Sequence, residues 1–160
     1  MKYVAKIKFS DIKKISIVFG SGKSLATLKN ELGCDFIING GLYDMNTNKP
    51  VCHLKVDGTV YSKETWNSWG YCWNSGNDIK MLQVPDKASS YNNYLTCVSI
   101  TTPYDGPTKQ LSYNSAVGGV RGRSAIGTTT DSLVLYCSSD GSSDAKSPEG
   151  LRTDMLNLGC

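Results

Sequence analysis

Hydrophobic residues alternate with polar ones at the start of the chain, where the apolar positions are Tyr3, Ala5, Ile7 and Phe9. A period of two residues is typical of a strand with one buried face. The β-branched run over residues 15–19 predicts a second strand, followed by a turn at residues 20–22. The continuous apolar run over residues 36–38 predicts a short, fully buried strand.

Two segments carry the signals of a helix. Ser24 predicts the N-cap of a helix that ends near Leu32, because leucines recur on one face, and Gly33 predicts its stop. Near the end of the chain, Ser147 and Pro148 predict the start of a second helix, since proline is tolerated in the first helical turn.

A turn signal at Asp57-Gly58 separates two short segments with strand composition. Residues 51–56 and 59–61 therefore predict a hairpin with a type I′ turn. Residues 94–101 and 133–137 predict further strands. These elements together predict an α+β fold, in which a mixed, mostly antiparallel sheet is accompanied by few helices.

The composition indicates one domain over residues 1–160. Apolar residues make up 39% of the chain and charged residues 19%, which argues against general disorder. The net charge of +3 is too small to indicate a nucleic-acid polymer as a partner. No apolar run approaches the roughly 18 residues that a membrane span needs. Charges throughout the first residues do not fit a signal peptide, so we expect a cytoplasmic protein without a membrane partner.

Six cysteines are scattered along the chain, and no two have the spacing of a CxxC motif. The single His53 does not complete a common zinc-binding set with thiols so far apart, so no metal site is predicted. We expect buried thiols rather than disulfides, because nothing in the sequence indicates an oxidising compartment. No pattern identifies a cofactor.

Residues 20–24 read GSGKS, which is similar to the end of a phosphate-binding loop. That motif requires another glycine five positions before Gly22, and the chain has Ile17 there. We therefore interpret the segment as a tight turn followed by the N-cap Ser24.

A candidate site follows the apolar run at residues 36–38. Asn39, Gly40 and Gly41 come directly after it, and Asp44 follows three residues later. One interpretation is a turn, because Asn and Gly readily adopt left-handed conformations. The other is a ligand site, in which the glycines let the backbone approach a ligand and Asp44 supplies a carboxylate. The residue types leave both open.

Arg121 and Arg123 lie among glycines, and in an extended segment they point to the same face. Two guanidinium groups on one face repel each other unless an anion or carboxylates lie between them, and phosphate suits their fork-shaped geometry. A solvated surface pair is the alternative. We favour an anion site, because the flanking glycines and the apolar residues 125–126 indicate burial.

Aromatic residues gather at Trp66, Trp69, Tyr71 and Trp73. Packing in the core explains such residues in most proteins, but aromatic side chains on a loop also suit the face of a sugar or a base. His53 is interpreted as a structural residue of a strand. Asp140-Gly141 is first a turn signal, although Asp140 follows a predicted strand and could reach a site.

Two segments of the chain are similar to each other. Residues 25–34 read LATLKNELGC and residues 151–160 read LRTDMLNLGC, with identity at five of ten positions. The first copy continues into an apolar run and a glycine turn, whereas the second ends at Cys160. The sequence therefore predicts an internal repeat with approximate two-fold symmetry, whose second copy lacks its strand and loop.

In this order, the motifs resemble the phosphodiester glycosidase family, which includes the lysosomal enzyme that removes N-acetylglucosamine from a phosphodiester. The resemblance covers most of the chain from Ser24 onward. Its motifs are IINGGLYD at residues 37–44, Pro50 with LKVDGTV at residues 54–60, RSAIG at residues 123–127, Asp140-Gly141 and the final LGC.

The resemblance implies a hydrolase that cleaves the sugar–phosphate bond of a sugar-1-phosphodiester, such as an N-acetylglucosamine phosphodiester. It implies that Arg123 binds the phosphate, that Asp44 and Asp140 act as catalytic carboxylates, and that Asn39 orients a sugar hydroxyl or the phosphate. The other residues expected to bind substrate are Gly40, Gly41, Arg121, Ser124, Trp69 and Tyr71.

Members of that family continue from the last helix into a strand and an Asp-Gly-Gly-Gly-Ser segment of the active site. This sequence ends at the helix, so we expect a fragment, a chain completed by a C-terminal partner chain, or a divergent protein. The alternative function is a non-catalytic protein that sequesters a sugar phosphate or a nucleotide-like ligand. Turnover of a sugar phosphodiester distinguishes the two functions.

Overall fold

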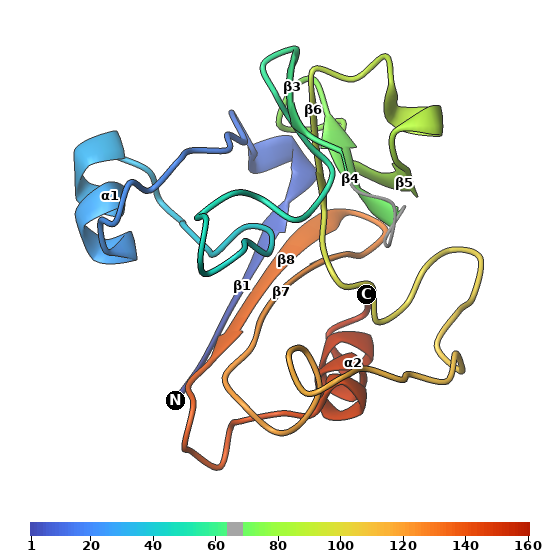
Figure 1. Cartoon of the computed structure of the whole chain (residues 1–160). Helices are drawn as coiled ribbons and strands as arrows, with labels where there is room; N and C mark the ends of the chain where they lie inside the picture. The colour runs from blue at the N-terminus through green and yellow to red at the C-terminus, as the bar shows by residue number, and fades with distance from the viewer. Residues whose placement is uncertain (64–68) are drawn as a thin grey trace.

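The computed structural model describes residues 1–63 and 69–160 (Figure 1). The strands described there form two sheets, and every pairing within them is antiparallel. The predicted α+β class with mostly antiparallel pairing is therefore confirmed. No helix in the described ranges is long and apolar enough to cross a membrane.

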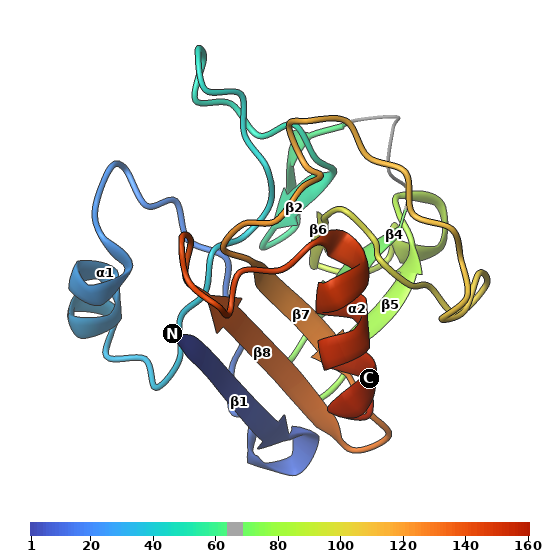
Figure 2. The same cartoon turned by 90° about the horizontal axis from the view of Figure 1, so that it is seen from below.

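The first sheet has three strands, in the order β1 (Lys2–Lys8), β8 (Ser132–Ser138) and β7 (Ser124–Thr128). Helix α2 (Pro148–Asn157) lies across one face of this sheet, as Figure 2 shows. Leu151 and Met155 of the helix pack on Val134 and Tyr136 of β8, whose side chains are fully buried. The predicted strand at residues 133–137 and the predicted second helix are both confirmed.

The second sheet has five strands, in the order β3 (Thr59–Ser62), β2 (Leu54–Val56), β6 (Asn93–Thr96), β4 (Trp69–Trp73) and β5 (Lys80–Gln83). One face of this sheet buries Cys72, Tyr94 and Val84 in a common cluster. Short 3-10 turns follow β1 and β5, as η1 (Phe9–Asp11) and η2 (Asp86–Ala88).

The two sheets meet through one apolar cluster. Trp73 at the end of β4 and Ile79 just before β5 pack with Leu133 of β8. The face of β8 opposite to α2 is thereby covered by the five-stranded sheet, so β8 lies between two layers, whereas β1 has no buried residue. Burial on both faces explains why β8 is apolar at almost every position.

The predicted hairpin is confirmed, with β2 and β3 joined by Asp57 and Gly58. Both residues have positive φ angles, 47° and 85°, as a type I′ turn requires. The predicted strand at residues 94–101 is shorter in the structure, because β6 ends at Thr96.

The predicted first helix is confirmed as α1 (Leu25–Leu32). Ser24 accepts a hydrogen bond from the backbone N–H of Thr27 at 3.1 Å, and Gly33 ends the helix with a φ of 60°. The GSGKS segment is therefore a turn and an N-cap, as interpreted.

The ends of α1 and α2 share one local geometry. Cys34 donates its N–H to the carbonyl of Lys29, and Cys160 donates to Met155, the corresponding residue of the repeat. Both glycines before these cysteines have positive φ, which is the Schellman arrangement. The surroundings differ, because Leu25 is largely exposed whereas Leu151 is buried. The two-fold repeat therefore remains a prediction.

The predicted strand at residues 15–19 is wrong, because this segment has no regular secondary structure. Ile15 and Ile17 still pack against the cluster between the sheets. The carbonyl of Ile15 accepts a hydrogen bond from Trp73 Nε1 at 3.0 Å. The indole N–H thus satisfies a carbonyl that the backbone N–H of a neighbouring strand would satisfy in a sheet. Apolar side chains anchor the segment without a neighbouring strand.

The predicted strand at residues 36–38 is also wrong. These residues line an apolar groove of about 260 Å³ together with Tyr3–Ala5 of β1 and residues 135–137 of β8. The segment runs beside the sheet without joining its ladder, and the Phe36 side chain remains half exposed. An apolar run forms a strand only where another strand satisfies its backbone groups.

Candidate functional site

A cleft of about 660 Å³ opens between segments that are far apart in the sequence. Its walls are formed by Leu42, Trp69 and residues 98–99, 109–114 and 116–117. Leu42 belongs to the NGGLYD segment, and residues 116–117 lie in the loop that precedes the two arginines. The cleft therefore touches one residue of the first motif and the loop before the second, and its volume is typical of a small-ligand site.

Arg121 fixes one part of the loop that forms the cleft wall. Its Nη1 donates to the carbonyl of Ala116 at 3.0 Å, and its Nη2 donates to the carbonyl of Ser115 at 2.8 Å. The Arg121 backbone forms an antiparallel bridge with Lys146, which holds the arginine next to the segment before α2. The side chain thus stabilises a loop that has no regular secondary structure.

Arg123 fixes the following part of the same loop. Its Nη1 donates to Val117 at 2.7 Å and its Nη2 to Gly119 at 2.6 Å, in both cases to the carbonyl. Its Nε donates to the carbonyl of Lys146 at 3.0 Å. Both arginines therefore reach one loop, as their alternation predicts, and carbonyl oxygens occupy the place expected for an anion. Three of the five N–H donors of Arg123 bind carbonyl groups within residues 1–63 and 69–160.

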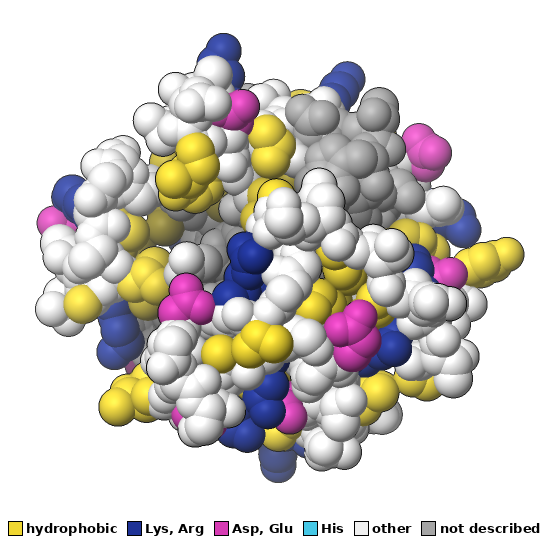
Figure 3. Space-filling model, turned by 60° about the horizontal axis from the view of Figure 1, so that its bottom comes forward, with side chains coloured by type: hydrophobic (Ala, Val, Ile, Leu, Met, Phe, Trp, Pro, Cys, Tyr) yellow, Lys and Arg dark blue, Asp and Glu magenta, His cyan; other side chains and the backbone are white. Residues whose placement is uncertain are grey.

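The charge of Arg123 is influenced by burial and by its neighbours. Burial lowers the pKa of the guanidinium, and the positive charge of Arg121 lowers it further, while Asp140 acts in the opposite direction. Asp140 accepts a hydrogen bond from the backbone N–H of Gly122 at 2.6 Å. Asp140 therefore lies near Arg123 and binds the backbone between the two arginines, although its own side chain is exposed. Figure 3 shows acidic and basic side chains interspersed on one face of the molecule.

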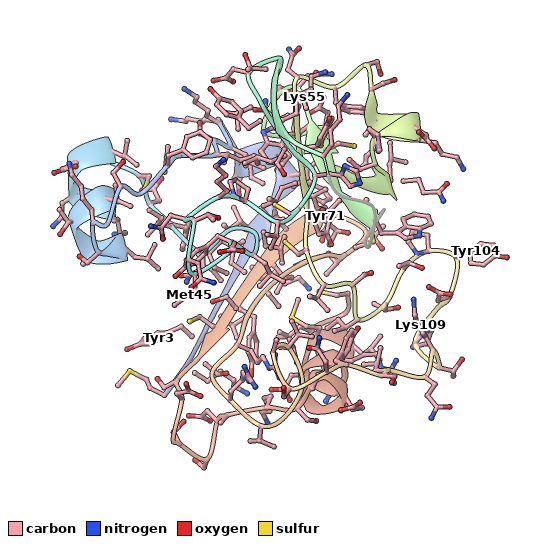
Figure 4. All side chains as sticks on the ribbon, viewed as in Figure 1. Tyr3, Met45, Lys55, Tyr71, Tyr104 and Lys109 are labelled. Carbon is pink, nitrogen blue, oxygen red and sulfur yellow. The ribbon has the colours of Figure 1, made fainter. Side chains whose placement is uncertain are left out.

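Lys109, which lines the cleft, belongs to a second polar cluster. Lys109 forms an ion pair with Asp105 at 2.7 Å, and the hydroxyl of Thr102 donates to the same carboxylate oxygen at 3.0 Å. These contacts lower the pKa of Asp105, the Lys109 hydrogen bond most. Arg152 of α2 donates to the carbonyl of Lys109. Figure 4 shows Lys109 on the outer loop that also carries Tyr104.

The aromatic residues of β4 have different surroundings. Trp69 lines the cleft. Tyr71 instead packs between the sheets, where its hydroxyl donates to the carbonyl of Ile126 at 3.5 Å. Burial raises the pKa of Tyr71 to about 12, in keeping with a structural position. Trp73 belongs to the core, and Trp66 lies outside the described residues.

The Asn39–Gly41 segment approaches the protein core closely. A Cβ atom at Gly41 would lie 2.7 Å from Cys52 Sγ and 2.9 Å from Leu95 Cδ1, so a larger residue would force these packed side chains to shift. At Gly40 the nearest atom would be 3.8 Å away, which is ordinary contact. Asn39 is exposed. The close approach that glycine permits at position 41 is thus to the five-stranded sheet.

Asp44 organises the turn that follows Leu42 in the sequence. Its Oδ1 accepts backbone hydrogen bonds from Asn46 at 2.7 Å and from Thr47 at 2.9 Å. These bonds, the one from Thr47 first, lower the pKa of Asp44. Tyr43 and Pro50 form an antiparallel bridge that closes the turn. The turn interpretation therefore accounts for this carboxylate.

The candidate residues fall into two groups. Arg121, Arg123 and Asp140 lie together at the start of β7, with Ser124 exposed beside them. The second group flanks Leu42 in the sequence, with the Asn39–Gly41 segment before it and Asp44 after it. None of the hydrogen bonds or ion pairs of the described residues joins Asp44 to Arg123. No residue of either group is among those that line the cleft, and Trp69 is the predicted site residue that the described structure places in its wall.

Sequence reasoning missed several residues of this region. Lys109, Tyr113 and Asn114 line the cleft, and the length of the loop before Gly119 was the signal that could have found them. Glu149, in the first turn of α2, is close enough to affect the pKa of Arg123. Within residues 1–63 and 69–160, no group of three or more His, Cys, Asp and Glu side chains is placed to bind a metal ion.

The comparisons with known proteins add no relative. No family model matches the chain, and no curated protein matches its sequence.

Proposed function

We propose that this protein is a hydrolase that cleaves the sugar–phosphate bond of a sugar-1-phosphodiester. The observation that carries the proposal is the position of the cleft. It adjoins Leu42 of the NGGLYD segment on one side and the loop bound by Arg121 and Arg123 on the other. Leu42 belongs to one motif of the resemblance to the phosphodiester glycosidases, and Arg123, which holds the loop, begins another.

The cleft residues suit the two halves of such a ligand. Trp69 offers an apolar ring to the face of a sugar. Lys109 also lines the cleft, with its ammonium group paired to Asp105 at 2.7 Å. Arg123 does not line the cleft itself, and it is proposed to reach a phosphate oxygen with its remaining N–H donors. A sugar phosphate or a nucleotide-like molecule is therefore the proposed ligand, with Asn39, Gly40, Gly41, Arg121, Ser124 and Tyr71 retained as proposed binding or supporting residues.

The proposed chemistry requires little proton donation, because a phosphate is a good leaving group. Positive charge develops on the sugar when the bond between its anomeric carbon and the phosphate oxygen breaks. Asp140, beside Arg123, is the proposed carboxylate that stabilises this charge or activates water. Asp44 is the second proposed carboxylate, because its turn follows Leu42 directly.

A non-catalytic binding protein is the second candidate, and two observations favour it. Asp44 Oδ1 already accepts two backbone hydrogen bonds, and Arg123 already donates to three carbonyl groups. Groups engaged in this way position a binding site well but are less available for a reaction. In this case the cleft would sequester a sugar phosphate or a nucleotide without cleaving it.

A partner chain and a cytoplasmic location, both expected from the sequence, are also part of the proposal. A C-terminal partner chain that adds a strand is supported by β7, which pairs only with β8 among the described strands. A cytoplasmic location agrees with the thiol state of the six cysteines.

The decisive experiment incubates the protein with the 4-nitrophenyl phosphodiester of N-acetylglucosamine in ¹⁸O-labelled water. Cleavage at the anomeric carbon releases reducing sugar that carries the label and leaves nitrophenyl phosphate unlabelled. Arg123→Ala and Asp140→Asn should each abolish most of this turnover, whereas Asp86→Asn, in an exposed turn of the other sheet, should not.

Calorimetric titration with the same compound distinguishes the two candidates. Binding without turnover, lost in Trp69→Ala, supports the binding protein. Label in the phosphate would indicate a phosphodiesterase instead, and the absence of both binding and turnover would contradict both candidates.

A further inference from the structure

Cys52 and Cys97 face each other across neighbouring strands. β2 and β6 pair in an antiparallel register in which Leu54 lies opposite Leu95. The register continues one step further, because the N–H of Thr96 donates to the carbonyl of His53 at 3.0 Å. The next step along both chains places Cys52 opposite Cys97.

The side chains of the two cysteines also point to the same side. Cys52, Leu54 and Val56 alternate along one strand and belong to one buried cluster, together with Leu95. Cys97 packs against this cluster, two residues after Leu95. Since side chains alternate along a strand, this common cluster indicates that both thiols face the same side of the sheet, and Cys52 is close enough to raise the pKa of Cys97.

The register gives the pair the spacing of a disulfide. The N–H of Thr96 donates to the carbonyl of His53, whereas the N–H of His53 donates to Thr96 Oγ1 at 2.8 Å, so the regular ladder ends at this pair. Cys52 and Cys97 follow directly beyond it, where the alternation of the ladder predicts a pair of the non-hydrogen-bonded kind. Directly opposite residues of that kind have Cα atoms about 4.5 Å apart. Disulfides join Cα atoms roughly 4.4–6.8 Å apart, so the bond needs no large backbone movement.

We propose that Cys52 and Cys97 are an oxidisable pair, which forms a cross-strand disulfide in the folded protein when a low-molecular-weight disulfide such as oxidised glutathione is present. All six cysteines are thiols in this structure. The proposal therefore assigns a second, oxidised state to this part of the fold.

The reaction proceeds through a mixed disulfide. The thiolate of Cys97, the more exposed of the two, attacks oxidised glutathione and releases one reduced glutathione. The thiolate of Cys52 then attacks the Cys97 sulfur, the protein disulfide forms, and a second reduced glutathione leaves. Two protein thiols lose two electrons and two protons in total, and the glutathione disulfide takes up both.

The surroundings of the pair make this reaction slow at neutral pH. Burial, with a smaller contribution from Cys52, raises the pKa of Cys97 to about 12, so little thiolate is present. The rate should therefore increase as the pH rises into the alkaline range. Once formed, the disulfide would lie directly under Gly41, next to the segment that leads to the cleft.

The test uses the intact chain in its folded state, treated with oxidised glutathione at neutral and at alkaline pH. Remaining thiols are alkylated in acid, and the digest is analysed by mass spectrometry. A cross-linked peptide that joins Cys52 to Cys97 is expected, in which neither cysteine carries an alkyl group or glutathione. The oxidised protein should also melt several degrees higher than the reduced one, because the bond closes a long loop.

Two variants serve as controls. Cys52→Ser should stop the reaction at the glutathione adduct of Cys97. Cys72 is another buried cysteine of the same sheet, and the Cys72→Ser variant should still form the cross-link. Exposed Cys137 reports that the oxidant is active, because it should acquire glutathione. The proposal is overturned if Cys137 is modified at alkaline pH while Cys52 and Cys97 remain thiols, or if they pair with other cysteines.

Discussion

Tyr136 donates its hydroxyl hydrogen to Asp154 Oδ2 at 2.9 Å and thereby connects the centre of β8 to α2. The same carboxylate oxygen lies 3.4 Å from Lys146 Nζ. Burial, and then the bond to Asp154, raise the pKa of Tyr136 to about 12. A fully buried tyrosine requires such a partner, so this pair helps to fix the helix on the sheet.

We predict that Tyr136→Phe lowers the free energy of unfolding by about 2 kcal/mol, the typical value for a hydrogen bond to a charged group. Urea denaturation measures the difference. Tyr104→Phe is the matched control, because the Tyr104 side chain is 87% exposed, and it should change the stability little. Equal losses in both variants would show that the bond to Asp154 contributes nothing specific.

We predict that Gly41→Ala destabilises the protein by roughly 1–3 kcal/mol, as expected when a methyl group is forced into a packed region. The added Cβ would lie 2.7 Å from Cys52 Sγ. Gly40→Ala is the control, since its Cβ would meet only Leu95 at 3.8 Å and should be tolerated. Thermal melting of the two variants side by side tests the difference. A stable Gly41→Ala variant would mean that the segment does not pack on the sheet in this way.

Signals that depend on neighbouring residues predicted the local structure well. Ser24 and Gly33 correctly predicted the two ends of the first helix, because a side-chain cap and a positive φ angle act within one turn. Asp57-Gly58 specified its hairpin for the same reason. The apolar runs at residues 15–19 and 36–38 failed as strands, because a strand also needs a partner that may lie anywhere in the sequence.

The candidate site could be predicted only in part. The residue pattern of Arg121 and Arg123 indicated one shared face, and both side chains do reach one loop. The sequence could not show that carbonyl oxygens of that loop would accept their hydrogen bonds, because a loop without regular structure leaves no periodic signal. Lys109 was missed for the same reason, since its place at the cleft depends on how the loop folds back.

We predict that Asp44→Asn has a pH-dependent effect on stability. The backbone hydrogen bonds from Thr47 and Asn46 lower the pKa of Asp44 in the folded state below 3.8, so the ionised carboxylate stabilises the turn. That stabilisation is complete well above pH 3.8 and is lost as the pH falls through the lower pKa of the folded state. The difference between wild type and variant should therefore shrink on acidification.

Nuclear magnetic resonance titration of the Asp44 carboxyl carbon measures the pKa directly. Denaturation of wild type and variant at neutral and at strongly acidic pH measures the difference in stability. Asp35→Asn, which also removes one exposed negative charge, controls for the change in net charge. A pKa of Asp44 above 3.8 would contradict the proposed hydrogen bonds.

Arg123 gives the sharpest test of how the cleft wall is held. Its guanidinium donates to three carbonyl groups in a fixed fork, and a lysine in its place cannot reach all three at once. We predict that Arg123→Lys lowers the free energy of opening the loop by about 2 kcal/mol. Chymotrypsin should then cut after Tyr113 roughly thirtyfold faster, because cleavage follows the population of the open loop.

Arg121→Lys is the graded control for this prediction. Arg121 donates to two carbonyl groups of the same loop, so its replacement should accelerate cleavage at Tyr113 less. Melting temperatures measured in parallel separate local opening from global unfolding, which would also increase cleavage in the strands. If Arg123→Lys leaves the cleavage rate at Tyr113 unchanged, the arginine does not hold the wall, and its guanidinium is instead available in full for a bound anion.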